Sequence, residues 1–238
     1  AACRWPVTAN GDDVIDYLVP EIMDADLDGD LQSVYARLGS GRIIEDIVKP
    51  NLSMLDGNKR PQYDAFEIKC AADIIKKYKP NLLFTHPGLV DHTRHETGLF
   101  NDQVTDALYT VDNWLGELFR AAEEAGIADD TDFVMMADHG HLSVCRVLCP
   151  NVFLAEEGLI RTSEDGSLFS WDAYIKTSGL SGMVYLRDPS DCALSARIEA
   201  FLRKLAADQI YGIGEVLNRE EAATRYHLAG EFSFVVES

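Results

Sequence analysis

The histidines of this chain are the residues whose types and spacing could do chemistry. Five of the six histidines fall in two clusters, residues 86–95 and 138–141, and each cluster also contains an aspartate. Mixed sets of histidine and aspartate suit Zn2+, with Mn2+ or iron as competitors, because imidazole nitrogens and carboxylate oxygens are common ligands of these ions. The sequence therefore predicts a metal site that is assembled from two separate stretches of chain.

The candidate metal ligands of the first cluster are Asp91 and His95. They are four residues apart, so one helical turn, or a comparably tight loop, aims both side chains at one point. His86 directly follows an apolar segment, and two roles stay open for it: support of the ligands or simple packing. His92 is expected to face solvent or substrate.

The candidate metal ligands of the second cluster are Asp138 and His139, which follow the apolar residues 133–137. The two ligands are adjacent, so the backbone must turn after the strand if both are to face one cavity, and Gly140 permits that turn. We expect His141 to contact substrate. No residue of either cluster is identified as a catalytic nucleophile.

Alternating helices and strands must position these clusters. Residues 61–78 and 98–125 carry apolar side chains at helical spacing, while residues 81–85 and 131–137 form short apolar runs that are typical of buried strands. This alternation predicts an α/β fold in which a mostly parallel sheet lies between helices. Because ligands collect beyond the carboxyl ends of parallel strands, the two clusters should meet at one edge of the sheet.

The rest of the chain is expected to complete a single domain over residues 1–238, with residues 143–180 as a small excursion. We expect residues 86–96 to form a loop or one irregular turn, and residues 152–154 to form a strand. The further predictions are two short helices within 31–48, helices at 190–207 and 219–226, and strands at 182–186, 213–217 and 231–236.

The composition narrows the possible partners. The chain has 238 residues, 47% of them hydrophobic, and a formal net charge of -19. This charge argues against a nucleic-acid polymer or an anionic membrane as partner, because their phosphates would be repelled; a small phosphate ester held by metal ions is not excluded. No apolar run reaches the ~18 residues of a transmembrane helix. The five scattered cysteines suggest reduced thiols and a cytoplasmic protein.

Two motifs resemble the alkaline phosphatase superfamily: Asp91-x-x-x-His95, and Asp138-His139-Gly140 after a strand. The nearest branch resembles the type I phosphodiesterase/nucleotide pyrophosphatase family, and Trp5-Pro6-Val7-Thr8 and residues 182–232 are also similar to its bacterial members. The resemblance implies an alkaline-phosphatase-like fold. It also implies a hydrolase that acts on phosphoric ester or anhydride bonds of a small substrate, of which a nucleotide is one candidate.

The resemblance further implies two divalent ions, zinc first and manganese as the alternative. Asp91 and His95 would bind one ion, and Asp138 and His139 the other. A Thr or Ser nucleophile would form a covalent phosphoryl intermediate, which water then hydrolyses. In the family this nucleophile and a further metal-binding Asp precede the Trp-Pro segment, and a last metal-binding His follows the final strand.

Neither of those regions matches this sequence, so we expect an internal portion of a longer chain that is inactive alone and binds little or no metal. Three alternatives stay open. Within the superfamily they are a cofactor-independent phosphoglycerate mutase and a phosphonate hydrolase, which Ala137-Asp138-His139-Gly140 alone does not distinguish. The third is a non-catalytic binding domain that has kept the fold and lost the chemistry.

Overall fold

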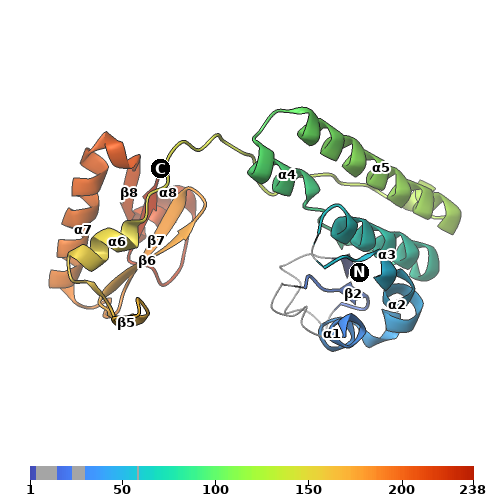
Figure 1. The fold of residues 1–238 in the computed structure, drawn as a ribbon, viewed down its shortest axis with the longest axis horizontal. Coiled ribbons are helices and arrows are strands. Elements are labelled where there is room, and N and C mark those ends of the chain that lie inside the picture. The colour runs from blue at the N-terminus through green and yellow to red at the C-terminus, as the bar shows by residue number, and fades with distance from the viewer. Residues whose placement is uncertain (4–14, 23–29, 58) are drawn as a thin grey trace. The chain divides into compact units, whose positions relative to one another are not determined.

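The protein consists of helices and strands of both pairing types, so the predicted mixed α/β class is confirmed. The chain folds as two compact units, Ala1–Ser143 and Val144–Ser238, which are described separately below (Figure 1). The predicted single domain over residues 1–238 stays a prediction. The structure, a computed structural model, describes residues 1–3, 15–22, 30–57 and 59–238.

The first unit contains a small parallel sheet. Strand β1 (Ala2–Cys3) lies between β2 (Leu18–Val19) and β3 (Phe84–Thr85), and both of its neighbours run parallel to it. Cys3 and Val19 are fully buried, so this sheet is part of the core of the unit. Strand β3 confirms the strand that was predicted within residues 81–85, in its last two residues.

Two long helices pack side by side (Figure 1), and the first of them also contacts β1 and β3. Helix α3 (Gln62–Tyr78) begins after Pro61 and is followed by Lys79, which has left-handed φ and ψ angles. Helix α5 (Asp102–Ala125) begins after Asn101, whose side chain accepts a hydrogen bond from a backbone N–H of the first turn. Both helices were predicted from apolar spacing, and both predictions are confirmed.

Residues 31–54 are almost entirely helical, which confirms helices in the predicted range 31–48. Helix α1 (Leu31–Leu38) begins after Asp30, whose carboxylate accepts a hydrogen bond from the backbone N–H of Gln32. A run of short helical segments follows, and together with α3 and α5 it encloses the core of the first unit. These segments are η3 (Gly41–Ile43), η4 (Ile44–Val48), α2 (Lys49–Asn51) and η5 (Leu52–Met54).

Two predictions for the first unit are wrong. Residues 86–96 were expected to form a loop or one irregular turn, but most of them belong to helix α4 (Leu89–Thr97). The sequence of this helix has no apolar periodicity, because Leu89 is its one buried residue and the other positions need not be apolar. Residues 131–137 were expected to form a strand, but the described backbone there pairs with no other strand. An apolar run favours extended backbone, and a strand also needs a partner for its hydrogen bonds.

The second unit is built on a four-stranded antiparallel sheet of order β6-β7-β9-β8. Its two faces carry different apolar side chains. On one face, Val184 and Phe234 pack with residues of helices α6 and α7, and on the other face Leu217 and Val235 pack with Ala222 of helix α8. The strands are β6 (Ala173–Ser178), β7 (Ser181–Leu186), β8 (Glu215–Asn218) and β9 (Phe234–Glu237); the helices are α6 (Pro150–Glu156), α7 (Cys192–Ala207) and α8 (Arg219–Tyr226).

The expected mostly parallel sheet is therefore present only in part. Parallel pairing is confined, among the strands described, to the small sheet of the first unit. In the second unit, β6 and β7 are joined by residues 179–180 alone, and so short a connection allows only antiparallel pairing. A two-stranded antiparallel hairpin, β4 (Ile160–Thr162) with β5 (Leu168–Trp171), completes this unit.

Residues 152–154 were predicted to form a strand and lie in helix α6 instead. A short apolar run does not distinguish a strand from a turn of buried helix. The deciding residue is Pro150, which occupies the first position of the helix, where its fixed φ is favourable and no N–H is needed. The predicted helices at 190–207 and 219–226 and the later strands are confirmed within a few residues.

Gly182 of the central strand β7 provides a test of this packing. A Cβ atom at Gly182 would lie 2.9 Å from the Cγ2 methyls of both Ile175 and Val236, and β-branched side chains have little freedom to move away. We expect Gly182→Ala to lower the free energy of unfolding by about 1–3 kcal/mol in urea denaturation.

The matched control is Gly214→Ala, because the nearest atoms to a Cβ there are 3.8 Å away. This control should change the free energy of unfolding by less than about 1 kcal/mol, in the stabilising direction if at all. Equal destabilisation by the two substitutions would contradict the packing described for β7.

Candidate metal centre

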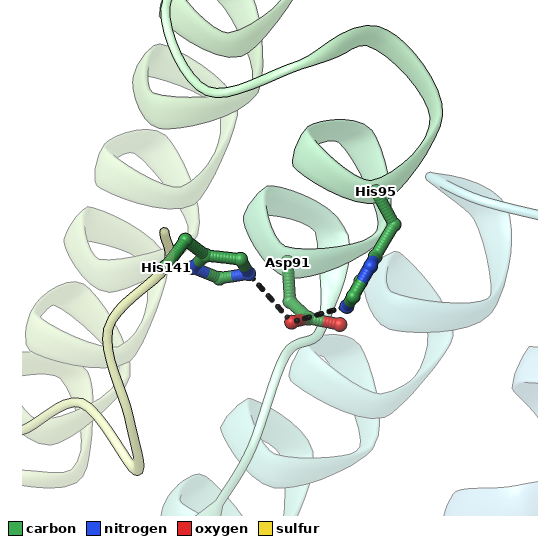
Figure 2. A group of neighbouring side chains, drawn as sticks. All are labelled: Asp91, His95 and His141. Atoms are coloured by element: carbon green, nitrogen blue, oxygen red, sulfur yellow. Dashed lines mark hydrogen bonds and ion pairs between the residues drawn. The ribbon is translucent and has the colours of Figure 1, made fainter. Parts of the chain in front are cut away.

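Helix α4 positions the first two candidate ligands. Asp91 lies in its first turn and His95 in its last turn, so the two side chains leave the same face of the helix, as Figure 2 shows. The Nε2 atom of His95 lies 3.4 Å from Oδ1 of Asp91. The predicted spacing of four residues thus brings both groups together through helical geometry.

His141 comes from the extended chain that follows residues 131–137 and reaches the same carboxylate (Figure 2). Its Nε2 atom lies 2.9 Å from Oδ1 of Asp91. The side chain of His141 is 13% exposed, while that of His95 is 70% exposed. Ligand atoms of Asp91, His95 and His141 all lie within 4.8 Å of one another, so the three residues form a group that could hold a metal ion.

The second predicted pair lies next to this group. His139 Nε2 is 3.4 Å from Oδ2 of Asp138 and 3.8 Å from Oδ1 of Asp91. His86, at the end of β3, places its Nε2 atom 3.5 Å from the same Oδ2 of Asp138. The other carboxylate oxygen of Asp138 accepts the backbone N–H of His139 at 3.0 Å, which holds Oδ2 toward the imidazoles.

The ring of His139 is oriented by the backbone. Its Nδ1 atom lies 3.0 Å from the carbonyl oxygen of Gly140, and because a carbonyl only accepts, Nδ1 carries the proton. The neutral ring therefore presents the Nε2 lone pair to Asp138 and Asp91. Metal-binding histidines commonly have this arrangement, with one nitrogen donating to a carbonyl and the other free to coordinate.

The same surroundings raise the pKa of His139. The Gly140 carbonyl is the largest cause, and the negative charges of Asp138 and Asp91 add to it, while desolvation acts in the opposite direction. Each of these favourable contacts stabilises the protonated ring over the neutral one. A cation at Nε2 would take the place of that proton.

The donor atoms fit a divalent metal ion. Two ligands of a tetrahedral zinc ion, each about 2.0–2.1 Å from it, are separated by about 3.3–3.4 Å. The separations of 3.4 Å for Asp91 and His95 and 3.4 Å for Asp138 and His139 match this value. The 2.9 Å between Asp91 and His141 is a hydrogen-bond distance, so this pair would have to lengthen slightly.

The structure thus brings together Asp91, His95, Asp138 and His139, the residues that the sequence nominated. Their role as metal ligands stays a prediction. His141, expected to contact substrate, lies among them and contacts Asp91. His92 lies 3.4 Å from Glu96 on the same helix. The segment Trp5-Pro6-Val7-Thr8 lies outside the residues that the structure describes.

Sequence reasoning expected His141 to contact substrate, not Asp91, and left the role of His86 open. The signal that could have found His141 is its separation of two residues from His139 on extended backbone, which puts alternate side chains on one side of the chain. For His86 the signal is the position itself, since it directly follows a strand of the parallel sheet. Both signals are weaker than a helical spacing of four.

A family model named type I phosphodiesterase / nucleotide pyrophosphatase matches residues 5–233, nearly the whole chain. The chain belongs to this family, as the resemblance of its two motifs predicted. The family consists of phosphoric ester hydrolases, so a hydrolase of phosphodiesterase or nucleotide pyrophosphatase type is indicated at that general level. No curated protein and no solved structure matches the chain. Within the part of the chain that is described, no helix has the length and apolar character needed to span a membrane.

The environment of His139 leads to a test on metal-free protein. Its pKa should lie above the usual 6.5, and an NMR titration of the imidazole protons measures it. Asp138→Asn should lower this pKa only part of the way, because the Gly140 carbonyl remains. Since folding favours the protonated ring, this group stabilises the metal-free fold below the usual pKa, and the contribution is lost as the pH rises through the raised value. A pKa at or below the usual value would contradict the described contacts.

Proposed function

We propose that this protein is a metal-dependent phosphodiesterase or nucleotide pyrophosphatase with an alkaline-phosphatase-like fold. The observation that carries the proposal is the convergence of two Asp/His pairs from different parts of the chain. Asp91 and His95 come from helix α4, Asp138 and His139 come from the extended segment after α5, and His139 lies 3.8 Å from Asp91. Family membership supports the reaction class, and the paired ligands support the use of metal.

In this proposal Asp91 and His95 hold one divalent ion, and Asp138 and His139 hold a second. Zinc is favoured by the mixture of imidazole and carboxylate ligands, and manganese is the alternative. When bound, such ions supply Lewis-acid polarisation of a phosphoryl group and neutralise its charge. The residues of the chain fix where this happens: α4 sets the spacing of the first pair, and the Gly140 carbonyl orients His139.

The substrate we propose is a small phosphate ester, with a nucleotide as one candidate. The formal net charge of -19 repels phosphate groups over most of the surface. At the metal centre formed by Asp91, His95, Asp138 and His139, bound divalent cations would add positive charge and attract a phosphate group. The side chains of Asp91 and Asp138 are about half exposed, at 43% and 52%, so a substrate can approach them from solvent.

The nucleophile in this proposal is a Thr or Ser that lies outside the 238 residues. The order of motifs in the family supports this assignment, because the nucleophile there precedes the segment that Trp5-Pro6 resembles. The chain alone would then supply metal ligands and no attacking group, and it would be inactive. The cysteines, all free among the described residues, support our placement of the protein in a reducing, cytoplasmic compartment.

The test is hydrolysis of a p-nitrophenyl nucleotide ester after chelation and return of zinc. We expect activity in the product of the whole gene and none in the 238 residues alone. Asp138→Asn or His139→Ala in the active protein should lower kcat/KM by at least ~100-fold, since even the loss of groups that only orient metal ligands costs 10–100-fold. His92→Ala is the matched control and should leave the rate unchanged.

Activity that survives chelation, or that does not depend on Asp138 and His139, would contradict the proposed chemistry. Equal rates for the whole gene product and the 238 residues would contradict the placement of the nucleophile. Parallel assays with phosphate monoesters and phosphonates decide the substrate class. A preference for either of these over the diester would favour another branch of the superfamily.

A further inference from the structure

We propose that His141 is a third protein ligand of the metal ion held by Asp91 and His95. This inference rests on the metal centre of the proposed function and extends it to a residue for which sequence analysis expected substrate contact. In the family pattern, the remaining histidine of the centre comes from beyond the last strand. Here a histidine within the first unit already reaches the same carboxylate.

The positions of the three side chains support coordination of one ion. Nε2 of His95 and Nε2 of His141 approach the same oxygen, Oδ1 of Asp91, at 3.4 and 2.9 Å. The two rings meet edge to face, with centroids 5.5 Å apart and planes inclined by 68°. Figure 2 shows both nitrogens directed at the Asp91 carboxylate from different elements. The donor atoms of the three residues come from two elements and all lie within 4.8 Å of one another, so one ion could be bound among them.

A second observation concerns the other nitrogen of His141. Its Nδ1 atom is buried and has no hydrogen-bond partner among the described residues, whereas Nδ1 of the neighbouring His139 lies 3.0 Å from the Gly140 carbonyl oxygen. Buried polar atoms rarely lack partners, so Nδ1 does not hold this ring in position. The ring of His141 is placed by its Nε2 atom, and that atom faces Asp91.

The number of ligands has a chemical meaning. Structural zinc sites use four protein ligands, while catalytic sites use three and keep the fourth position for an exchangeable group. Asp91, His95 and His141 make a set of three, and two imidazoles with one carboxylate are a combination that catalytic zinc sites use. One ion would therefore be held by residues of the first unit alone. Tight binding of one ion by the 238 residues follows, in contrast to the little or no metal expected from the sequence.

The test measures metal affinity of the 238-residue chain and needs no activity. Chelator-treated protein is titrated with Zn2+ by calorimetry, for the wild type and three variants. His141→Ala and His95→Ala should each weaken binding at one site by at least ~100-fold, because loss of a ligand exceeds the 10–100-fold cost of losing a supporting group. His92→Ala, on the same helix as His95, is the matched control and should bind as the wild type does.

The outcomes separate this inference from the proposed function. If His95→Ala weakens binding and His141→Ala does not, His141 is no ligand, and the inference is overturned while the metal centre stands. If the wild-type 238 residues bind no zinc, the inference is overturned, whereas the proposed function is decided separately by the zinc-dependent hydrolysis of the whole gene product. Circular dichroism of the metal-free variants shows whether they fold, and a further substitution covers the case in which His141→Ala does not.

That substitution is His141→Cys, studied with Co2+ in place of zinc. A thiolate bound to cobalt gives an intense charge-transfer absorption in the near ultraviolet, which the wild type and His92→Cys should lack. The chain has five cysteines of its own, so these two samples supply the baseline. Cobalt uptake by the His141→Cys protein without this band would overturn the inference.

Discussion

One carboxylate oxygen, Oδ1 of Asp91, is the point on which the candidate centre depends. Three imidazole nitrogens lie around it, from His95 at 3.4 Å, His139 at 3.8 Å and His141 at 2.9 Å. Neutral imidazoles donate one hydrogen bond each, and His139 already gives its proton to Gly140. The Nε2 lone pair of His139 therefore faces the carboxylates of Asp138 and Asp91, whose negative charge stabilises a cation there, either a proton or a metal ion.

The core of the first unit holds the two elements that meet at this point. Helix α4 packs against α5, which in turn packs on α3 and shares its buried face with the main apolar cluster. The extended segment also packs on α5: the rings of Phe133 and Phe119 meet edge to face, with their centroids 4.5 Å apart. Val134, Met135 and Met136 beyond that contact are 83%, 69% and 78% exposed. The extended segment is therefore held at Phe133 by α5 and at His141 by Asp91, while the residues that directly follow Phe133 are exposed.

Sequence reasoning recovered what local rules determine. The spacing of Asp91 and His95 holds because both lie on one helix, although that helix was missed, since its sequence carries charge in place of an apolar stripe. The prediction of a strand at 131–137 was wrong because a strand needs a hydrogen-bonding partner elsewhere in the chain, and the apolar residues 131–137 do not specify one. The contact of His141 with Asp91 was missed for a similar reason. Asp91 lies fifty positions earlier in the chain, and no local spacing links the two residues.

The most direct test of the account is anomalous diffraction from crystals of the zinc-loaded protein, recorded on both sides of the zinc absorption edge. The account predicts a strong anomalous peak within coordination distance, about 2.0–2.2 Å, of Asp91 and His95, and a second beside Asp138 and His139. Zinc that is found elsewhere on the molecule, with these side chains free of it, would contradict the central claim that the two pairs form one metal centre.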